Sequence, residues 1–247
     1  MNIKFSGSTA LIMGGTCTAA ITLAEYMIKA EIFPVLTFRS QKGLNIINNQ
    51  LNKFKGQYKT CHLNFNDFSS IDSAFKEIGN KLDYLIDFAH SNFESLIASA
   101  SFDDISSYFT SNIIFRAEII KRTARLMLQK KRGRLIFISS TVAHKPNKGQ
   151  GYYAAAKLAC EALYRNIGIE MGERGITTTI IRPGYLDAGR SLNFFKKNKD
   201  NILNKIPIKR LITIQELAET ILFYISDSAK SFNADIITMD GGLTVLK

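Results

Sequence analysis

Tryptophan is absent from the 247 residues, and cysteine, histidine and proline are scarce, with three, three and four copies. Cys17, Cys61 and Cys160 are odd in number and widely spaced, so they form neither a disulfide framework nor a metal-binding pattern. We therefore expect free thiols and no metal site. No run approaches the roughly 20 apolar residues that cross a bilayer, and the first residues do not resemble a signal peptide. We expect a cytoplasmic protein without a membrane partner.

Acidic residues are few relative to basic ones, 21 against 32, which gives a formal net charge of +11. This excess suggests an acidic partner, an anionic substrate or a polyanion, although a Lys- and Asn-rich proteome would also produce it. Nucleic-acid binding is not expected, because the basic residues are not interleaved with aromatics and no recognised motif is present.

Short apolar runs alternate with longer helical patterns along the chain. The expected strands are Ala10–Met13, Phe33–Phe38, Thr60–Phe65, Leu82–Ala89, Arg134–Ser139, Thr177–Arg182 and Asp235–Asp240. The expected helices are Thr18–Ala30, Gly43–Phe54, Ser70–Ile78, Ser107–Lys130, Tyr152–Glu173 and Ile214–Ser226. This alternation is typical of parallel strands joined by right-handed crossovers. It predicts an α/β fold: a single Rossmann-type doubly wound parallel sheet of about seven strands, helices on both faces, one domain over residues 1–247. The segment Asp187–Lys205 is expected to be an irregular loop that lines the ligand crevice.

Tyr153 and Lys157 form the clearest chemical pattern in the sequence, YAAAK. On a helix, residues four apart share a face, so the phenol and the ammonium lie near each other. A nearby cation lowers the pKa of a phenol from its usual value of about 10. The phenol can then exchange a proton with a substrate oxygen near neutral pH. Such a pair also occurs by chance on a solvated helix face.

Two other positions add context to this pair. Ser140 ends the expected fifth strand, thirteen positions before Tyr153, and a hydroxyl at the carboxyl end of a parallel strand faces the ligand crevice. Asn112 lies inside an expected helix, where asparagine is a poor helix former. A solvent-facing polar position is the alternative for Asn112.

Together, Asn112, Ser140, Tyr153 and Lys157 resemble the catalytic tetrad of the short-chain dehydrogenases/reductases, with a spacing similar to the bacterial 3-oxoacyl-acyl-carrier-protein reductases. The resemblance covers essentially the whole chain. Its other motifs are GRLIFISS at 133–140, RPGY at 182–185, PIKRL at 207–211 and DGG at 240–242.

The resemblance implies a role for each residue of the tetrad. Tyr153 would give a proton to the carbonyl oxygen, and Ser140 would hydrogen-bond that oxygen. Lys157 would lower the pKa of the tyrosine and hold the nicotinamide ribose, and Asn112 would anchor a water chain that restores the proton. Gln150 and Tyr185 are the substrate candidates, and an ordinary loop amide is the alternative for Gln150.

The cofactor loop departs from the family pattern TGxxxGxG. Residues 13–20 read MGGTCTAA, so Gly14 is retained while Thr18 and Ala20 replace the later glycines. Thr18 is expected to intrude on the phosphates, unless its hydroxyl caps the helix or binds a phosphate oxygen. His90 stands where the family has glycine. The resemblance assigns cofactor contacts to Gly14, Thr16, Cys17, Thr18, Ala19, Arg39, Ser40, Asn64, Phe65, Phe88, Ala89, His90, Tyr153, Lys157, Pro183, Gly184 and Leu186.

Arg39 and Ser40 follow the second expected strand. An acidic residue there would bind the ribose 2′-hydroxyl of NAD, whereas an arginine accommodates the 2′-phosphate. We therefore expect NADPH rather than NADH, with a solvated Arg39 as the alternative.

The resemblance also implies partners. In this family the helices expected at 107–130 and 152–173 pair across a two-fold axis, which predicts a homodimer or homotetramer. The apolar residues that we interpret as the pairing faces are Ile113, Ile120 and Met127 on one helix, and Leu158, Leu163 and Ile167 on the other. Lys131 and Arg174 lie where the carrier-protein reductases dock an acidic acyl-carrier protein, although basic residues also suit a helix C-terminus for dipole reasons.

The sequence therefore predicts an NADPH-dependent carbonyl reductase that acts on a 3-oxoacyl thioester in fatty-acid or polyketide-type synthesis. Two alternatives remain open. One is an oxidoreductase that acts on another alcohol or ketone, because substrate choice depends on the loops. The other is a non-catalytic partner subunit with an impaired cofactor site, which the altered glycine loop favours.

Overall fold

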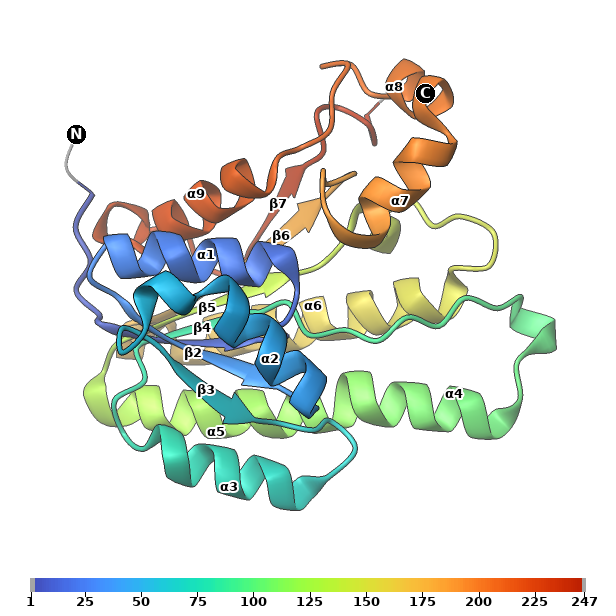
Figure 1. Ribbon diagram of the computed structural model, residues 1–247. Helices are drawn as coiled ribbons and strands as arrows, with labels where there is room; N and C mark the ends of the chain where they lie inside the picture. The colour runs from blue at the N-terminus through green and yellow to red at the C-terminus, as the bar shows by residue number, and fades with distance from the viewer. Residues whose placement is uncertain (1–2, 246–247) are drawn as a thin grey trace.

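The computed structural model describes residues 3–245, apart from the side chains at positions 190, 191 and 193. Seven parallel strands form one sheet in the order β3-β2-β1-β4-β5-β6-β7 (Figure 1). The strands are β1 (Thr9–Met13), β2 (Phe33–Phe38), β3 (Lys59–His62), β4 (Tyr84–Asp87), β5 (Gly133–Ile138), β6 (Ile176–Pro183) and β7 (Asp235–Met239). This order confirms the predicted doubly wound sheet. The order reverses between β1 and β4, and a crevice forms at the carboxyl ends of strands at such a point.

Helices cover both faces of the sheet, as its pattern of burial requires. They are α1 (Thr18–Lys29), α2 (Gln41–Gln50), α3 (Phe68–Ile78), α4 (Phe102–Phe109), α5 (Phe115–Lys130), α6 (Gly151–Met171), α7 (Gly189–Lys197), α8 (Lys199–Lys205) and α9 (Ile214–Ile225). Successive strand residues point to opposite faces. Ala10 and Ile12 therefore pack with α1, α2 and α9, while Leu11 and Met13 pack with α3, α5 and α6.

The helix predicted over 107–130 differs from the observed one. Helix α4 begins at Phe102, because Ser101 caps it by accepting from the Asp104 N–H, and Asp103 and Asp104 lie in its first turn. A π-helical segment, Thr110–Ile114, then joins α4 to α5 and carries Asn112. Single-turn π segments are frequent at functional sites.

The prediction of an irregular loop over Asp187–Lys205 was wrong, because α7 and α8 occupy most of this segment. The side chains of Tyr185 and Phe194 stack with ring centroids 6.1 Å apart, which holds α7 against the end of β6. Both helices lie beyond the carboxyl ends of β6 and β7, at the upper right of Figure 1.

The remaining expectations concern thiols, metals and membranes. All three cysteines are free. Over residues 3–245 no group of three His, Cys, Asp or Glu side chains is placed to hold a metal ion. Within the same residues, no helix is long and apolar enough to cross a membrane.

Candidate active site

Helix α6 places Tyr153 and Lys157 on one face, as the spacing predicts. The Lys157 side chain runs under the tyrosine, with Nζ 5.8 Å from the centroid of the Tyr153 ring. Its ammonium is buried at 3% exposure and donates to the Ile138 carbonyl at 2.8 Å. Burial, followed by the charge of Arg116, lowers the pKa of Lys157 to about 7. The amine therefore titrates near neutral pH, far below an ordinary lysine.

The two serines after β5 have different surroundings. Ser139 is buried, and its hydroxyl donates to Glu161 at 2.5 Å. Glu161 also accepts two bonds from Arg182, so the Ser139 hydroxyl belongs to a structural cluster. Ser140 is half-buried and accepts from the Val142 N–H at 3.2 Å. The role of the Ser140 hydroxyl as a donor to a substrate oxygen stays a prediction.

Asn112 is buried in the π-helical segment. Its side-chain amide donates to the Ser91 hydroxyl, the Tyr108 carbonyl and the Ser111 hydroxyl, and its Oδ1 accepts from the Ser91 N–H at 3.1 Å. The amide thus ties the segment after β4 to the π turn. The alternative of a solvent-facing Asn112 is wrong.

A buried ion pair that the sequence analysis missed lies beside these residues. Asp87 ends β4, Arg116 begins α5, and both side chains are at most 1% exposed, with Nε and Oδ2 2.6 Å apart. The Tyr164 hydroxyl donates to the same oxygen at 2.9 Å. A charged residue in a helix that otherwise turns apolar side chains to the sheet was the available signal.

His90 lies against the candidate acid. Its ring packs edge-on against Tyr153 with centroids 4.8 Å apart, and its Nε2 shares a 2.7 Å hydrogen bond with the Tyr108 hydroxyl. Tyr108, on α4, is itself buried against Tyr152 and Ala156 of α6 in a small aromatic cluster. The histidine therefore shapes the wall next to Tyr153, and its contact with a cofactor stays a prediction.

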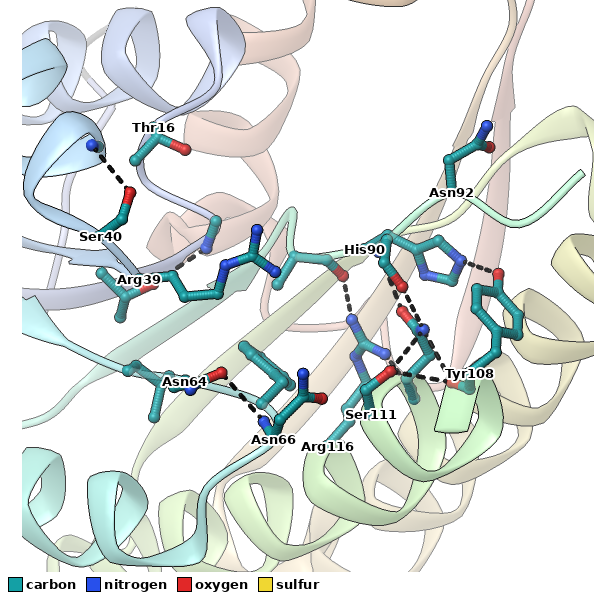
Figure 2. A pocket seen from close by; sticks show the side chains of 18 of the residues that line it. Thr16, Arg39, Ser40, Asn64, Asn66, His90, Asn92, Tyr108, Ser111 and Arg116 are labelled. Atoms are coloured by element: carbon teal, nitrogen blue, oxygen red, sulfur yellow. Dashed lines mark hydrogen bonds between the residues drawn. The ribbon is translucent and has the colours of Figure 1, made fainter. Parts of the chain in front are cut away.

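A cavity of about 620 Å³ opens at the carboxyl ends of β1, β2 and β4. In Figure 2, Thr16, Ser40 and Arg39 lie on one wall, and His90 and Tyr108 lie on the opposite wall. Of the predicted cofactor residues, the cavity is lined by Gly14, Thr16, Arg39, Ser40, Asn64, Phe65, Ala89 and His90, and Asn112 also lines it. The cavity lining does not include Cys17, Thr18, Ala19, Phe88, Tyr153, Lys157, Pro183, Gly184, Leu186 or the substrate candidates.

The glycine loop has the geometry of a phosphate cradle. Gly14 has φ +73°, and a Cβ there would lie 2.8 Å from the Ala89 nitrogen. Cys17 is the N-cap of α1 and makes no side-chain cap bond. Thr18 is the first helical residue, exposed to solvent, so the interpretation of Thr18 as the helix cap is wrong. Amides of a first turn have no partner inside the helix, and such amides can bind a phosphate.

The remaining predicted residues lie around the ends of β6 and α6. Gly184 donates to the Met239 carbonyl at 2.9 Å, and Leu186 pairs with Ile212. Gln150, at the N-cap of α6, accepts from the Asn147 amide at 3.0 Å. Lys131 and Arg174 are exposed. They follow α5 and α6, at the amino-terminal edge of the sheet and the opposite end of α6 from Tyr153.

Comparisons with known proteins agree with this geometry. A family model described as enoyl-(acyl carrier protein) reductase matches residues 19–244. The chain is 31% identical to the 3-oxoacyl-acyl-carrier-protein reductase FabG of Buchnera aphidicola subsp. Baizongia pistaciae, over 98% of the chain and 99% of the relative. It is 26% identical to FabG of Escherichia coli K12, with the same coverage. A crystal structure from Agrobacterium tumefaciens, described as a candidate gluconate dehydrogenase, superposes with a TM-score of 0.90 at 20% identity, covering 99% of this chain and 98% of the other.

Proposed function

The chain belongs to the short-chain dehydrogenase/reductase family and is an NAD(P)-dependent oxidoreductase acting on alcohol or carbonyl groups; we propose that it reduces a 3-oxoacyl thioester to the 3-hydroxyacyl form with NADPH. The relatives named 3-oxoacyl-acyl-carrier-protein reductase match over nearly their whole length, which supports this substrate class. Fatty-acid or polyketide-type synthesis is the setting in which such a reduction occurs.

One observation carries the proposal: Tyr153 lies over the buried Lys157 amine and packs against His90, which lines the cavity. Tyr153 gives its phenolic proton to the carbonyl oxygen of the substrate, and the Ser140 hydroxyl donates a hydrogen bond to the same oxygen. Lys157 stabilises the tyrosinate through its positive charge. The proton transfer requires the hydroxyl to be within hydrogen-bonding reach of the substrate.

The residues present fit a nicotinamide dinucleotide, which supplies the hydride when bound. Gly14 lets the chain approach the pyrophosphate, and the first-turn amides of α1 hold it. Arg39 extends from the end of β2 into the cavity (Figure 2). Arg39 would bind a ribose 2′-phosphate, and neither position 39 nor position 40 carries the carboxylate that binds the ribose 2′-hydroxyl of NAD. Both features support NADPH.

The first test is reduction of acetoacetyl-coenzyme A with NADPH by the wild type and by Tyr153→Phe. The variant keeps the ring over Lys157 but loses the proton donor, so we expect turnover to fall at least about 10²-fold while NADPH binding persists. Tyr224→Phe, on α9, is the matched control and should behave as the wild type. Near-normal turnover of Tyr153→Phe would refute Tyr153 as the acid.

The two alternatives give other results in the same experiment. An enzyme that acts on another alcohol or ketone would bind NADPH and leave acetoacetyl-coenzyme A unreduced. A non-catalytic subunit would bind neither NADPH nor NADH at millimolar concentration, which calorimetry measures directly.

An acidic acyl-carrier protein at Lys131 and Arg174 is part of the proposal. Helix α6 has 21 residues and is about 30 Å long at 1.5 Å per residue, and these basic residues lie at its far end from Tyr153. The homo-oligomer, the cytoplasmic location and the single domain over 1–247 stay predictions.

A further inference from the structure

The Asp87–Arg116 pair is fully enclosed and fully bonded. Asp87 Oδ2 accepts from Arg116 Nε at 2.6 Å and from the Tyr164 hydroxyl at 2.9 Å. Its Oδ1 accepts from the Ala89 N–H at 3.0 Å and from Arg116 Nη2 at 3.4 Å. The Asp87 side chain is 0% exposed, and that of Arg116, which lines the cavity, is 1% exposed.

The remaining bonds of the guanidinium reach two main-chain segments of the candidate site. Nη2 donates to the carbonyl of Ala89, which lines the cavity after β4. Nη1 donates to the carbonyl of Asn112 in the π-helical segment. The Cys160 thiol, from α6, donates to the same carbonyl at 3.3 Å. Since a carbonyl oxygen has two lone pairs, the Asn112 carbonyl is already satisfied by protein groups.

Stability alone does not explain this pair. A buried ion pair is costly to desolvate, and well-packed apolar residues of similar volume are often equally stable or more so. The pair does have a charged neighbour, because Arg116 and Lys157 both lie against the Phe137 ring, 5.6 and 4.8 Å from its centroid. After burial, the Arg116 charge is the largest cause of the lowered pKa of Lys157, and Asp87 opposes it.

The other groups around Lys157 also come from identified elements. From its own helix it faces Tyr153, Cys160 and Glu161. Glu161 is neutralised by its bidentate pair with Arg182 of β6. Tyr164 binds Asp87, and burial raises its pKa well above 10, so it stays neutral. Among these groups, Arg116 is the cation that opposes protonation of Lys157.

We propose that Arg116, held by Asp87, is a positioning residue of the active site: it fixes the main chain at Ala89 and Asn112 and sets the charge that Lys157 faces. The proposal rests on the proposed function, because it gives Lys157 a part in the reaction. A purely structural pair would hold the same segments together without any effect on the titration of Lys157.

Electrostatics gives the two partners opposite effects. Arg116→Met removes a repelling cation and leaves the Asp87 carboxylate to attract the ammonium, so the pKa of Lys157 should rise by about one unit or more. Asp87→Asn leaves the Arg116 charge uncompensated, so the pKa should fall by a similar amount. The double variant Asp87→Asn/Arg116→Met should return most of the way to the wild-type value.

The titration is measured by ¹³C NMR of protein with lysine labelled at Cε, in the absence of nucleotide and substrate. The Lys157 signal is identified by its loss in Lys157→Met. The pH profile of kcat/KM for acetoacetyl-coenzyme A is recorded on the same variants. The apparent pKa of this profile should move in the same directions as the pKa of Lys157. Arg122→Met is the matched control, since Arg122 lies on α5 but pairs with Glu118 and Asp72 at the surface.

Opposite shifts in the two single variants support the proposal, whereas shifts in the same direction, or none, overturn it. If Arg116→Met fails to fold, Arg116→Lys replaces it as the test variant. Because Arg116→Lys retains the positive charge, the pKa of Lys157 in it should lie within about half a unit of the wild-type value. A larger rise in the pKa of Lys157 overturns the proposal. Because the NMR titration needs no turnover, failure of the proposed function, seen as absent nucleotide binding, is distinguished from failure of this inference.

Discussion

At the residue scale, Lys157 links the stability of the fold to pH. Its folded pKa of about 7 lies below the ordinary value of 10.5. Between these values the unfolded chain binds a proton that the folded chain does not, so the free energy of unfolding rises with pH in this window. The burial penalty is complete below pH 7 and is relieved as the pH increases.

Comparison with Lys157→Met isolates the contribution of this site, because groups away from Lys157 titrate equally in both proteins. We expect Lys157→Met to have a higher free energy of unfolding than the wild type below pH 7. Above pH 7, the free energy of unfolding of the wild type should rise relative to that of the variant by up to about 1.4 kcal/mol per pH unit. Chemical denaturation at pH 6, 7, 8 and 9 measures the difference. A difference that is independent of pH would mean that Lys157 keeps its proton across the window.

Thr18 offers a second test at the residue scale. It is exposed at the start of α1 and does not cap the helix, and we expect its side chain to crowd a pyrophosphate bound at the first-turn amides. Thr18→Gly should tighten NADPH binding by about 1 kcal/mol, the scale of one hydrogen bond or a modest clash. Calorimetry measures the change, and weaker binding in the variant would identify the Thr18 hydroxyl as a phosphate ligand.

Residue patterns predicted part of the site and missed the rest for a physical reason. Tyr153 and Lys157 are four apart on one helix, so local geometry brings them together. Asp87 and Arg116 are 29 positions apart, and their pairing depends on how β4 and α5 pack. A sequence lists charges without showing which of them face each other in the interior.

At the element scale, α7 is the largest departure from the sequence-based expectation. Asn and Lys make 187–205 resemble a loop, but α7 turns an apolar side chain, Phe194, onto Tyr185 at 6.1 Å. A helix this short is marginal by itself and depends on such packing. The amphipathic pattern was present in the sequence, and polar composition concealed it.

Phe194→Ala should therefore loosen α7 without disturbing the sheet. Because α7 lies past the carboxyl end of β6, we expect the KM for acetoacetyl-coenzyme A to rise several-fold, with a smaller change in kcat. Thermal stability should change little, since Phe194 is 52% exposed. Lys196→Ala, on the same helix and exposed, is the control. An unchanged KM in Phe194→Ala would separate α7 from substrate binding.

Strand elements were easier to predict than helix ends. Buried parallel strands are continuous apolar runs, so β2 matches its expected bounds and the other strands differ by one to three residues at an end. The long helix was harder to place, because Ser101 starts it earlier and the π turn at Asn112 interrupts it. Both depend on hydrogen bonds that residue periodicity does not encode.

At the scale of the whole molecule, the helix faces predicted to join subunits need correction. Ile120 and Met127 are buried against the sheet and cannot reach a partner. Leu158, from the predicted face, is exposed at 45%, and two further apolar residues are exposed on the same layer, Ile114 at 55% and Ile169 at 68%. Leu158 and Ile169 are eleven residues apart, about three helical turns, so they share one face of α6.

An outward apolar stripe on a long helix is typical of a protein interface. We therefore expect the wild type to be a dimer or tetramer at micromolar concentration by light scattering, with the exposed face of α6 in the contact. The double variant Leu158→Glu/Ile169→Glu places like charges in that contact on both subunits and should shift the protein to smaller species. Ile46→Glu, a partly exposed position on α2, controls for the added charge and should keep the wild-type mass. A monomeric wild type would refute the predicted dimer or tetramer. A double variant with the same oligomeric mass as the wild type would show that the interface does not involve the exposed face of α6.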